Sequence, residues 1–279
     1  MNCWVNGRAG TTVSSRDRGL HYGDGVFETM RVQRRTVRLL DHHLERLTEG
    51  CGRLALRLPA APQLRRELLG IAATRSDAVL KLIVTRGVGP RGYGATGRER
   101  GNRLIFIYPY SAPARRASEG PVRLRLCATR LGINPMLAGL KTLNRLESVL
   151  ARAEWKDRRV WDGLLRDGDD HIVCGTMSNL FVRRGSCLTT PRLDRCGIAG
   201  VMRRWVLEQA DSLHLRVVEG RIRWDDLGNA EEVFMTNAVA GIVPVASIRN
   251  AAVTLRMAET CIAHALRALL DAGNPRDLR

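Results

Sequence analysis

The sequence predicts an α+β protein made of two subdomains. Strand-like and helix-like segments both occur, and they are unevenly segregated along the chain. A stretch rich in Ala, Ser, Pro and Arg near 111–121 has the composition of a linker. The 279 residues suffice for one large domain or two ordinary ones. We therefore expect an N-terminal subdomain over 1–112, a linker over 113–121 and a C-terminal subdomain over 122–279.

The first part alternates short strands with one clear helix. Leucines in "HHLERLTEGCGRLAL" are mostly helix-spaced, and Asp41 stands where a helix N-cap is expected. The segment "AVLKLIVTRGVGPRGYG" is typical of a strand that enters a glycine-rich loop. The remaining expected strands are "CWVNG", two strands within "VFETMRVQRRTVRLL", and "NRLIFIYPY".

The second part opens with a strand, "VRLRLCATR", and then an amphipathic helix, "TLNRLESVLARAEWKDRR". Turn-forming residues divide 162–191 into several strands. A helix is expected near 200–213, a strand at "EEVFMTNAV" and a C-terminal helix near 254–272.

Composition narrows the class of protein. The chain has no long apolar run and no apolar signal-peptide core, so we expect a cytoplasmic protein without a membrane partner. Seven scattered cysteines without a C-x-x-C pair disfavour a disulfide framework or a zinc site. The net charge of +17 comes from arginines spread over the whole length, with only three lysines and 5% aromatics. That pattern favours an arginine-biased composition, or attraction of an acidic small molecule, over nucleic-acid binding.

Three features suggest a site for a phosphorylated cofactor. Lys141 is expected to open a helix, where the helix dipole would disfavour the charged amine and so suit a Schiff-base lysine. Position alone, however, favours an ordinary first-turn lysine. The turn "CGIAG" leads into a helix whose N–H groups could bind phosphate, and Arg46 could add a charge-assisted contact. A solvated helix arginine remains the alternative for Arg46.

A flexible loop, "TRGVGPRGYG", carries Arg86, Arg91 and Tyr93. The planar guanidinium group suits carboxylates, so the loop is a candidate for substrate binding. A plain surface hairpin is the alternative.

Taken in order, the motifs resemble the class-IV aminotransferase family, whose enzymes use pyridoxal 5'-phosphate (PLP) and share fold type IV. The likeness covers nearly the whole chain, from "SSRDRGLHYGDGVFETMRV" and "LLDHHLERL" through "GTMSNLF" and "LTTPRLDRCGIAGVMRR" to "VFMTNAVAGIVPV". The segments "NPMLAGLKTLNRLE" and "RGY" are most similar to 4-amino-4-deoxychorismate lyases. The other motifs are shared with branched-chain and D-amino-acid aminotransferases.

The resemblance implies a smaller N-terminal α/β sandwich, a larger C-terminal β-barrel-like part, PLP between them, and a homodimer. It implies that Lys141 forms the Schiff base with PLP and then moves protons. Arg46 would bind the phosphate and Asn144 would lie beside the ring. The phosphate cup would be completed by Gly197, Ile198, Ala199, Asn237 and Ala238. A carboxylated substrate would be held by Arg91 and Tyr93, with Thr29 and Arg31.

The chain departs from the family at Cys174. The family typically has glutamate two residues before the Thr of "GTMSNLF", where it pairs with the protonated pyridine nitrogen and keeps the ring electron-poor. A neutral thiol is a poor substitute, and Asp169 and Asp170 fit an exposed turn. Three interpretations follow: a weakened electron sink, replacement by another group or a water, or a nearly inactive relative.

The resemblance therefore implies a PLP-dependent carbon–oxygen lyase that makes 4-aminobenzoate and pyruvate for folate biosynthesis. One alternative is a D-amino-acid or branched-chain aminotransferase on the same fold. Another is a PLP-binding or nucleic-acid-binding protein with little or no turnover. No metal is expected, and the partners are a carboxylated small molecule and a second copy of the chain.

Overall fold

The computed structural model describes residues 2–110, 117 and 119–273. Chain contacts divide it into two compact units. Unit 1 comprises Met1–Tyr110 and Leu140–Asn144; unit 2 comprises Ser111–Gly139 and Arg145–Arg279. The linker predicted at 113–121 lies partly outside the described residues and stays a prediction.

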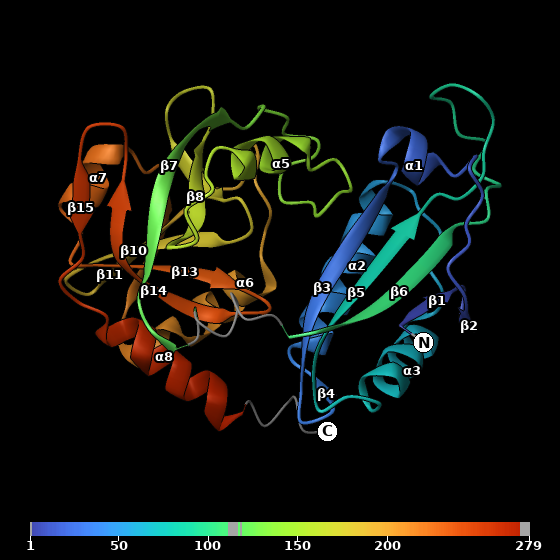
Figure 1. Cartoon of the computed structure of the whole chain (residues 1–279), viewed down its shortest axis with the longest axis horizontal. Helices are drawn as coiled ribbons and strands as arrows, with labels where there is room; N and C mark the ends of the chain where they lie inside the picture. The colour runs from blue at the N-terminus through green and yellow to red at the C-terminus, as the bar shows by residue number, and fades with distance from the viewer. Residues whose placement is uncertain (1, 111–116, 118, 274–279) are drawn as a thin grey trace. The chain divides into compact units, whose positions relative to one another are not determined.

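Unit 1 is built on an antiparallel sheet with strand order β2-β1-β6-β5-β3-β4 (Figure 1). Its two longest strands, β3 and β5, pair over their whole length. Side chains in β5 alternate between buried and partly exposed, as a sheet with one covered face requires. The strands are β1 (Cys3–Val5), β2 (Arg8–Ala9), β3 (Gly25–Gln33), β4 (Thr36–Val37), β5 (Asp77–Thr85) and β6 (Asn102–Pro109).

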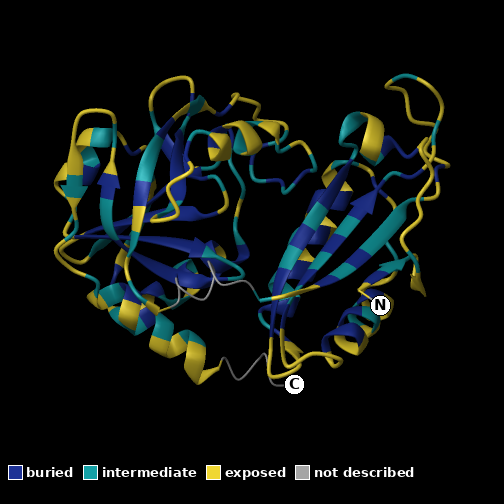
Figure 2. Cartoon of the chain, in the orientation of Figure 1, coloured by how far each residue is buried: buried dark blue, intermediate teal, exposed yellow. Residues whose placement is uncertain are grey.

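Two helices cover one face of this sheet, α2 (Leu40–Arg53) and α3 (Ala61–Ala72). Their leucines and the inward side chains of β3, β5 and β6 form one apolar core, which is dark in Figure 2. A short helix, α1 (Arg18–Tyr22), precedes β3. Asp41 lies in the first turn of α2 and is not the N-cap, because the backbone turns at Leu39 with a left-handed conformation.

Unit 2 contains a curled sheet with strand order β12-β11-β10-β13-β14-β7-β8-β9 and β15 beside β14. The last strand, β9, returns toward the first, because the N–H of Ile172 donates to the carbonyl of Ile222 at 2.7 Å. The strands are β7 (Val122–Arg130), β8 (Val160–Arg166), β9 (Ile172–Gly175), β10 (Asn179–Arg184), β11 (Cys187–Pro191), β12 (Arg216–Gly220), β13 (Glu232–Asn237), β14 (Gly241–Arg249) and β15 (Thr254–Arg256). This return makes the sheet barrel-like, and the predicted α+β fold class is confirmed.

The helices of unit 2 differ from the expected bounds at two places. The helix predicted over 142–159 is α5 (Leu146–Ala153), and the one predicted near 254–272 is the strand β15 followed by α8 (Cys261–Ala272). The helix expected near 200–213 is present as α6 (Val201–Gln209) with a 3₁₀ turn, η1 (Ala210–Leu213); α7 (Trp224–Gly228) completes the set. Among the described residues, no helix combines the length and apolarity needed to cross a membrane.

Candidate active site

Lys141 lies in an extended segment at the edge of the unit 1 sheet. The N–H of Phe27 donates to the carbonyl of Lys141 at 3.0 Å, and the N–H of Leu143 donates to Gly25 at the same distance. The expectation that Lys141 opens a helix is wrong, because pairing with β3 holds this residue extended. Lys141 is therefore not in the first turn of a helix, because the next helix begins only at Leu146.

The amine of Lys141 lies against an aromatic ring. Its Nζ is 4.2 Å from the centroid of the Phe27 ring, and Nζ of Lys81 is 5.4 Å from the same ring. Lys141 also acts electrostatically on His43. The segment Leu140–Asn144 thus brings Lys141 to the polar cluster behind β3 within unit 1.

That cluster is centred on Glu28, a buried carboxylate. His43 Nδ1 lies 2.6 Å from Glu28, and the guanidinium of Arg46 donates two hydrogen bonds to it, at 2.8 and 2.5 Å. Burial opposes ionisation of Glu28, but Arg46 and His43 hold its pKa at about 2. Burial also lowers the pKa of His43, so its ring is neutral near pH 7. Glu28 thereby fixes the orientation of Arg46.

Glu28 and His43 were not among the site residues predicted from the sequence. Their signal was available: Glu28 interrupts the apolar face of β3, and His43 lies one helical turn before Arg46. A buried acid in an apolar strand needs partners, and a facing helix with His and Arg three residues apart can supply them.

Asn144 ends the extended segment. Its Nδ2 donates to the carbonyl of Tyr22, at the end of α1, with a distance of 3.2 Å. Lys141 and Asn144 are therefore both held within unit 1, one through β3 and one through α1.

The residues expected to bind substrate lie in two places of unit 1. Arg91 and Tyr93 are exposed on the loop between β5 and β6, and 87% of Tyr93 is accessible. Thr29 and Arg31 lie on β3 itself. Arg31 is buried, bonded to the carbonyl of Ala78 at 3.1 Å and paired with Asp77. This guanidinium is committed to the sheet, which weighs against a contact with substrate.

Cys174 lies in β9 of unit 2, opposite Leu165 of β8. It is buried in an apolar cluster that includes Trp155, Val173 and Cys196. Burial raises the pKa of the thiol far above its ordinary value, so it stays protonated near pH 7. Asp169 and Asp170 are exposed in the turn before β9, as expected. The thiol is neutral and offers no charge.

Asp162, a buried carboxyl in β8, organises the turn that follows Cys174. Its oxygens accept hydrogen bonds from the hydroxyls of Thr176 and Ser178, both at 2.6 Å, and from the N–H of Thr176 at 3.0 Å. A Cβ on Gly175 would lie only 2.2 Å from Asp162 Oδ2. Burial raises the pKa of Asp162 despite these bonds. The carboxyl group of Asp162 therefore already accepts hydrogen bonds from the turn 175–178 on both of its oxygens.

The turn expected to bind phosphate precedes α6, whose N-cap is Gly200. Gly197 has a positive φ of 88°, which favours glycine. The N–H of Ala199 donates to the carbonyl of Gly139 at 3.0 Å, and Asn179 Nδ2 donates to the carbonyl of Ile198 at 2.8 Å. The Ala199 donor is therefore already used, while the N–H of Ile198 bonds to no other described residue.

A second turn lies after β13. The side-chain oxygen of Asn237 accepts from the N–H groups of Val239 at 2.8 Å and Ala240 at 3.1 Å, while its Nδ2 donates to the carbonyl of Met177 at 2.6 Å. Asn237 therefore joins the turn at Ala238 to the turn that Asp162 organises. Unit 2 has its own set of ordered turns: 175–178, 197–200 and 237–240.

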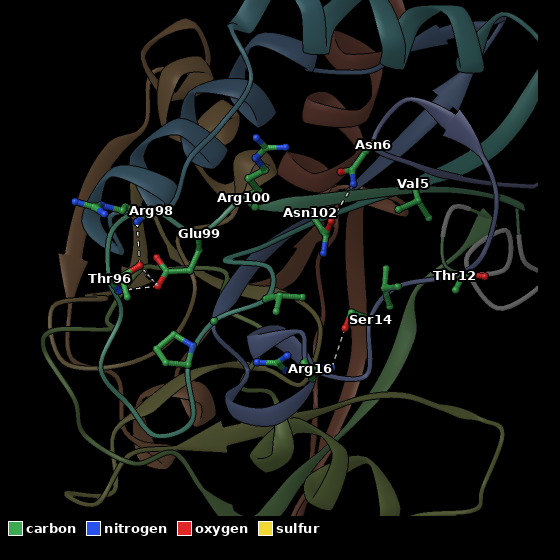
Figure 3. Close-up of a pocket in the computed structure, with 15 residues that line it drawn as sticks. Val5, Asn6, Thr12, Ser14, Arg16, Thr96, Arg98, Glu99, Arg100 and Asn102 are labelled. Atoms are coloured by element: carbon green, nitrogen blue, oxygen red, sulfur yellow. Dashed lines mark hydrogen bonds between the residues drawn. The ribbon is translucent and has the colours of Figure 1, made fainter.

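A separate pocket of about 670 Å³ lies within unit 1, beside β1 and the loop before β6 (Figure 3). Arg16, Arg98 and Arg100 line it, yet Arg98 and Arg100 point outward in the view. The carboxylate of Glu99 accepts two hydrogen bonds from Thr96, one from its N–H at 2.6 Å and one from its hydroxyl at 2.9 Å. None of the residues predicted from the sequence to bind cofactor or substrate, or to take part in catalysis, lines this pocket.

Comparison with known proteins decides the family. The model of amino-transferase class IV matches residues 25–248. An aminodeoxychorismate lyase of Vibrio harveyi is 38% identical over 250 residues, 88% of this chain and 90% of the relative. The chain belongs to the amino-transferase class IV family. The solved structure of 4-amino-4-deoxychorismate lyase from Pseudomonas aeruginosa is 43% identical, with a TM-score of 0.90 over 97% of this chain and 98% of that one.

Family members with other activities are also similar to this class IV chain. A D-alanine aminotransferase of Bacillus licheniformis is 27% identical over 245 residues, 86% of this chain and 84% of the relative. Membership of the family confirms the predicted enzyme class and the cofactor, PLP. The residues present fit that cofactor in part: a lysine, an oriented arginine and a helix-start N–H suit it, while the neutral thiol of Cys174 does not suit its ring nitrogen.

Proposed function

We propose that this class IV enzyme is a 4-amino-4-deoxychorismate lyase, which converts 4-amino-4-deoxychorismate to 4-aminobenzoate and pyruvate. The observation that carries the proposal is its 43% identity to the Pseudomonas aeruginosa lyase over almost the entire length of both chains. The products contain all the atoms of the substrate, so no second substrate is needed. The reaction would supply 4-aminobenzoate for folate synthesis.

Residues of both units are proposed to hold PLP. Lys141 would bind its aldehyde carbon, and Arg46, oriented by Glu28, would pair with its phosphate. Gly197, Ile198 and Ala199, with the turn at Asn237 and Ala238, would surround the phosphate; of the two N–H donors expected there, the one on Ile198 is available. Asn144 would lie beside the ring.

When bound, PLP would accept the electron pair left at the substrate carbon as its C–H bond breaks. Nζ of Lys141 is the proposed base and would take the proton from that carbon. Cleavage of the enolpyruvyl ether C–O bond would then leave an aromatic ring, and the departing enolpyruvate would take up a proton to become pyruvate. Because aromatisation is itself favourable, we propose that the lyase tolerates Cys174 better than a transaminase would.

The proposal favours a weakened electron sink over replacement of the missing glutamate by Asp162. Asp162 already accepts hydrogen bonds on both oxygens, and its raised pKa reflects the cost of charge at this buried place. Arg91 and Tyr93 are proposed to hold the substrate carboxylate, together with Thr29, whereas the guanidinium of Arg31 is already bound to Ala78 and Asp77. A homodimer is proposed from the family's usual assembly.

The test is PLP addition followed by a coupled assay for pyruvate with aminodeoxychorismate as substrate. Pyruvate release with formation of 4-aminobenzoate supports the lyase, and Lys141→Ala should abolish both activity and the visible absorbance of a lysine Schiff base. Lys156→Ala is the matched control, because Lys156 is an exposed lysine that follows α5 in the chain. Amino transfer from a D- or branched-chain amino acid to an oxo acid, without pyruvate release from aminodeoxychorismate, would overturn the proposal.

A further inference from the structure

Arg18 is a buried arginine that belongs to none of the expected sites. It stands at the start of α1, and only 4% of it is exposed. Its guanidinium faces the loop between β5 and β6, where Nη1 donates to the carbonyl of Gly92 at 2.8 Å and Nη2 donates to that of Tyr93 at 2.8 Å. A longer bond of 3.3 Å reaches Gly94. One side chain therefore gathers three consecutive carbonyls of this loop.

The other contacts of Arg18 fix it in place. Its Nε donates to Asp24 at 2.9 Å, and Arg86 donates to the same carboxylate at 2.7 Å. The guanidinium carbon lies 4.9 Å from the centroid of the Tyr22 ring, and the hydroxyl of Tyr22 accepts from the N–H of Gly92 at 3.1 Å. The N–H of Gly92 and the carbonyls of Gly92, Tyr93 and Gly94 are thus bound from inside unit 1.

The side chains of Arg91 and Tyr93 in the same loop are exposed. Tyr93 keeps most of its surface exposed, with its ring 5.4 Å from that of Tyr22, and Arg91 is exposed with no hydrogen bond or ion pair to a described residue. A buried guanidinium is costly unless its donors are satisfied, and only its planar fork can reach several carbonyls at once. Here the guanidinium of Arg18 holds a short glycine-rich loop in one shape.

We propose that Arg18 is a positioning residue, which pre-organises the loop 90–94 so that Arg91 and Tyr93 are presented to the carboxylate of the substrate. The inference rests on the proposed function, because that function assigns a carboxylated substrate to this loop. Ordering the loop before binding removes an entropic cost that substrate would otherwise have to offset. Arg18 itself would not touch substrate.

The experiment compares Arg18→Met with Arg16→Met in the full-length, PLP-loaded enzyme. Arg16 is two residues away and exposed, and its side chain, which Figure 3 draws among those that line the pocket beside β1, bonds to no described residue; it is the matched control. Trypsin cleavage between Arg91 and Gly92, followed by mass spectrometry, should become at least about tenfold faster in Arg18→Met only. KM for the carboxylated substrate should rise about 10- to 100-fold while kcat stays within about threefold.

Unchanged cleavage after Arg91, or a looser loop with unchanged KM, would overturn the proposal. Tyr22→Phe provides a milder variant if Arg18→Met does not fold. It removes the hydroxyl that accepts the hydrogen bond from the N–H of Gly92, and it should raise both the cleavage rate and KM by a smaller factor. Failure of the proposed function has a different signature, because the wild-type enzyme would then release no pyruvate, whatever the state of the loop. The KM comparison would in that case use the amino donor that the enzyme accepts, and an unchanged KM would again count against Arg18.

Discussion

At the scale of single residues, two buried groups control the charge around the proposed cofactor. In unit 1, Glu28 stays ionised because Arg46 and His43 bind it. In unit 2, Cys174 stays neutral because burial disfavours its thiolate. Glu28 fixes the orientation of Arg46, which we propose binds the phosphate of the cofactor, whereas the neutral thiol of Cys174 would offer no anion to a pyridinium nitrogen.

Cys174→Glu should raise the rate of pyruvate release by about 10- to 100-fold. A charge-assisted hydrogen bond contributes about 1.5–3 kcal/mol, and about 1.4 kcal/mol corresponds to a tenfold rate. Steady-state kinetics of the PLP-loaded protein measures the effect, with Cys174→Gln as the uncharged control of equal size. An unchanged rate in Cys174→Glu would show that the thiol does not limit the reaction.

Glu28→Gln should lower the free energy of unfolding by about 3–5 kcal/mol, because it removes the buried anion that pairs with the half-buried Arg46. Urea unfolding at pH 7 checks this, and Glu49→Gln on the exposed face of α2 should change it by less than about 0.5 kcal/mol.

The same carboxylate predicts a pH dependence. Its folded pKa of about 2 lies below the value of about 4.3 in an unfolded chain, so its contribution is complete above pH 4.3 and is lost as the pH falls toward 2. The wild type should therefore lose more stability than Glu28→Gln across that window. Parallel pH profiles of the two proteins would contradict the assignment.

At the scale of elements, turns matter more than helices for the proposed site. The turn after β9 is held by Asp162, the turn before α6 is bonded to Gly139, and the turn after β13 is closed by Asn237. The turns after β9 and β13 directly follow buried strands, so their backbones start from fixed positions. Asp162 and Asn237 thus hold the shape of turns that are proposed to bind the cofactor.

Gly175→Ala should destabilise the turn after β9. The added Cβ would lie 2.2 Å from Asp162 and 2.4 Å from Ser178, so both hydrogen-bonded groups would have to move. We expect a loss of about 1–3 kcal/mol in thermal or urea unfolding. Gly168→Ala is the control, because its Cβ would meet no atom closer than 3.6 Å. Equal stabilities of the two variants would contradict the model of a tightly held turn.

At the scale of the whole molecule, the residues proposed to hold PLP are divided between the two units. Lys141, Arg46 and Asn144 belong to unit 1, whereas Cys174 and the phosphate turns belong to unit 2. The chain passes from unit 2 to unit 1 at Leu140 and returns at Arg145. Lys141 therefore lies on a five-residue segment of unit 1, and the chain segments before and after it belong to unit 2.

PLP should slow hydrogen exchange in both units of the wild-type protein, in the segment around Arg46 and in the turn 197–200. A ligand at 100 times its Kd stabilises a protein by about 2.7 kcal/mol. Hydrogen exchange with mass spectrometry resolves the two regions, and Lys141→Ala should lose most of the effect while Lys156→Ala keeps it. Protection confined to one unit would contradict the proposed set of residues.

The sequence by itself determined the fold class, the family and the order of the motifs, because these depend on local periodicity and on residue types at fixed spacing. Most strands of the N-terminal part, the helix that carries Arg46 and the turn leading into α6 were predicted from such patterns, whereas β12, β14 and β15 were not. Only the tertiary structure decided that Lys141 is extended, that Arg31 is bound within the sheet and that Arg18 and Glu28 are buried among partners. These facts depend on pairing between residues far apart in the chain, such as Lys141 with Phe27, which local propensity does not record.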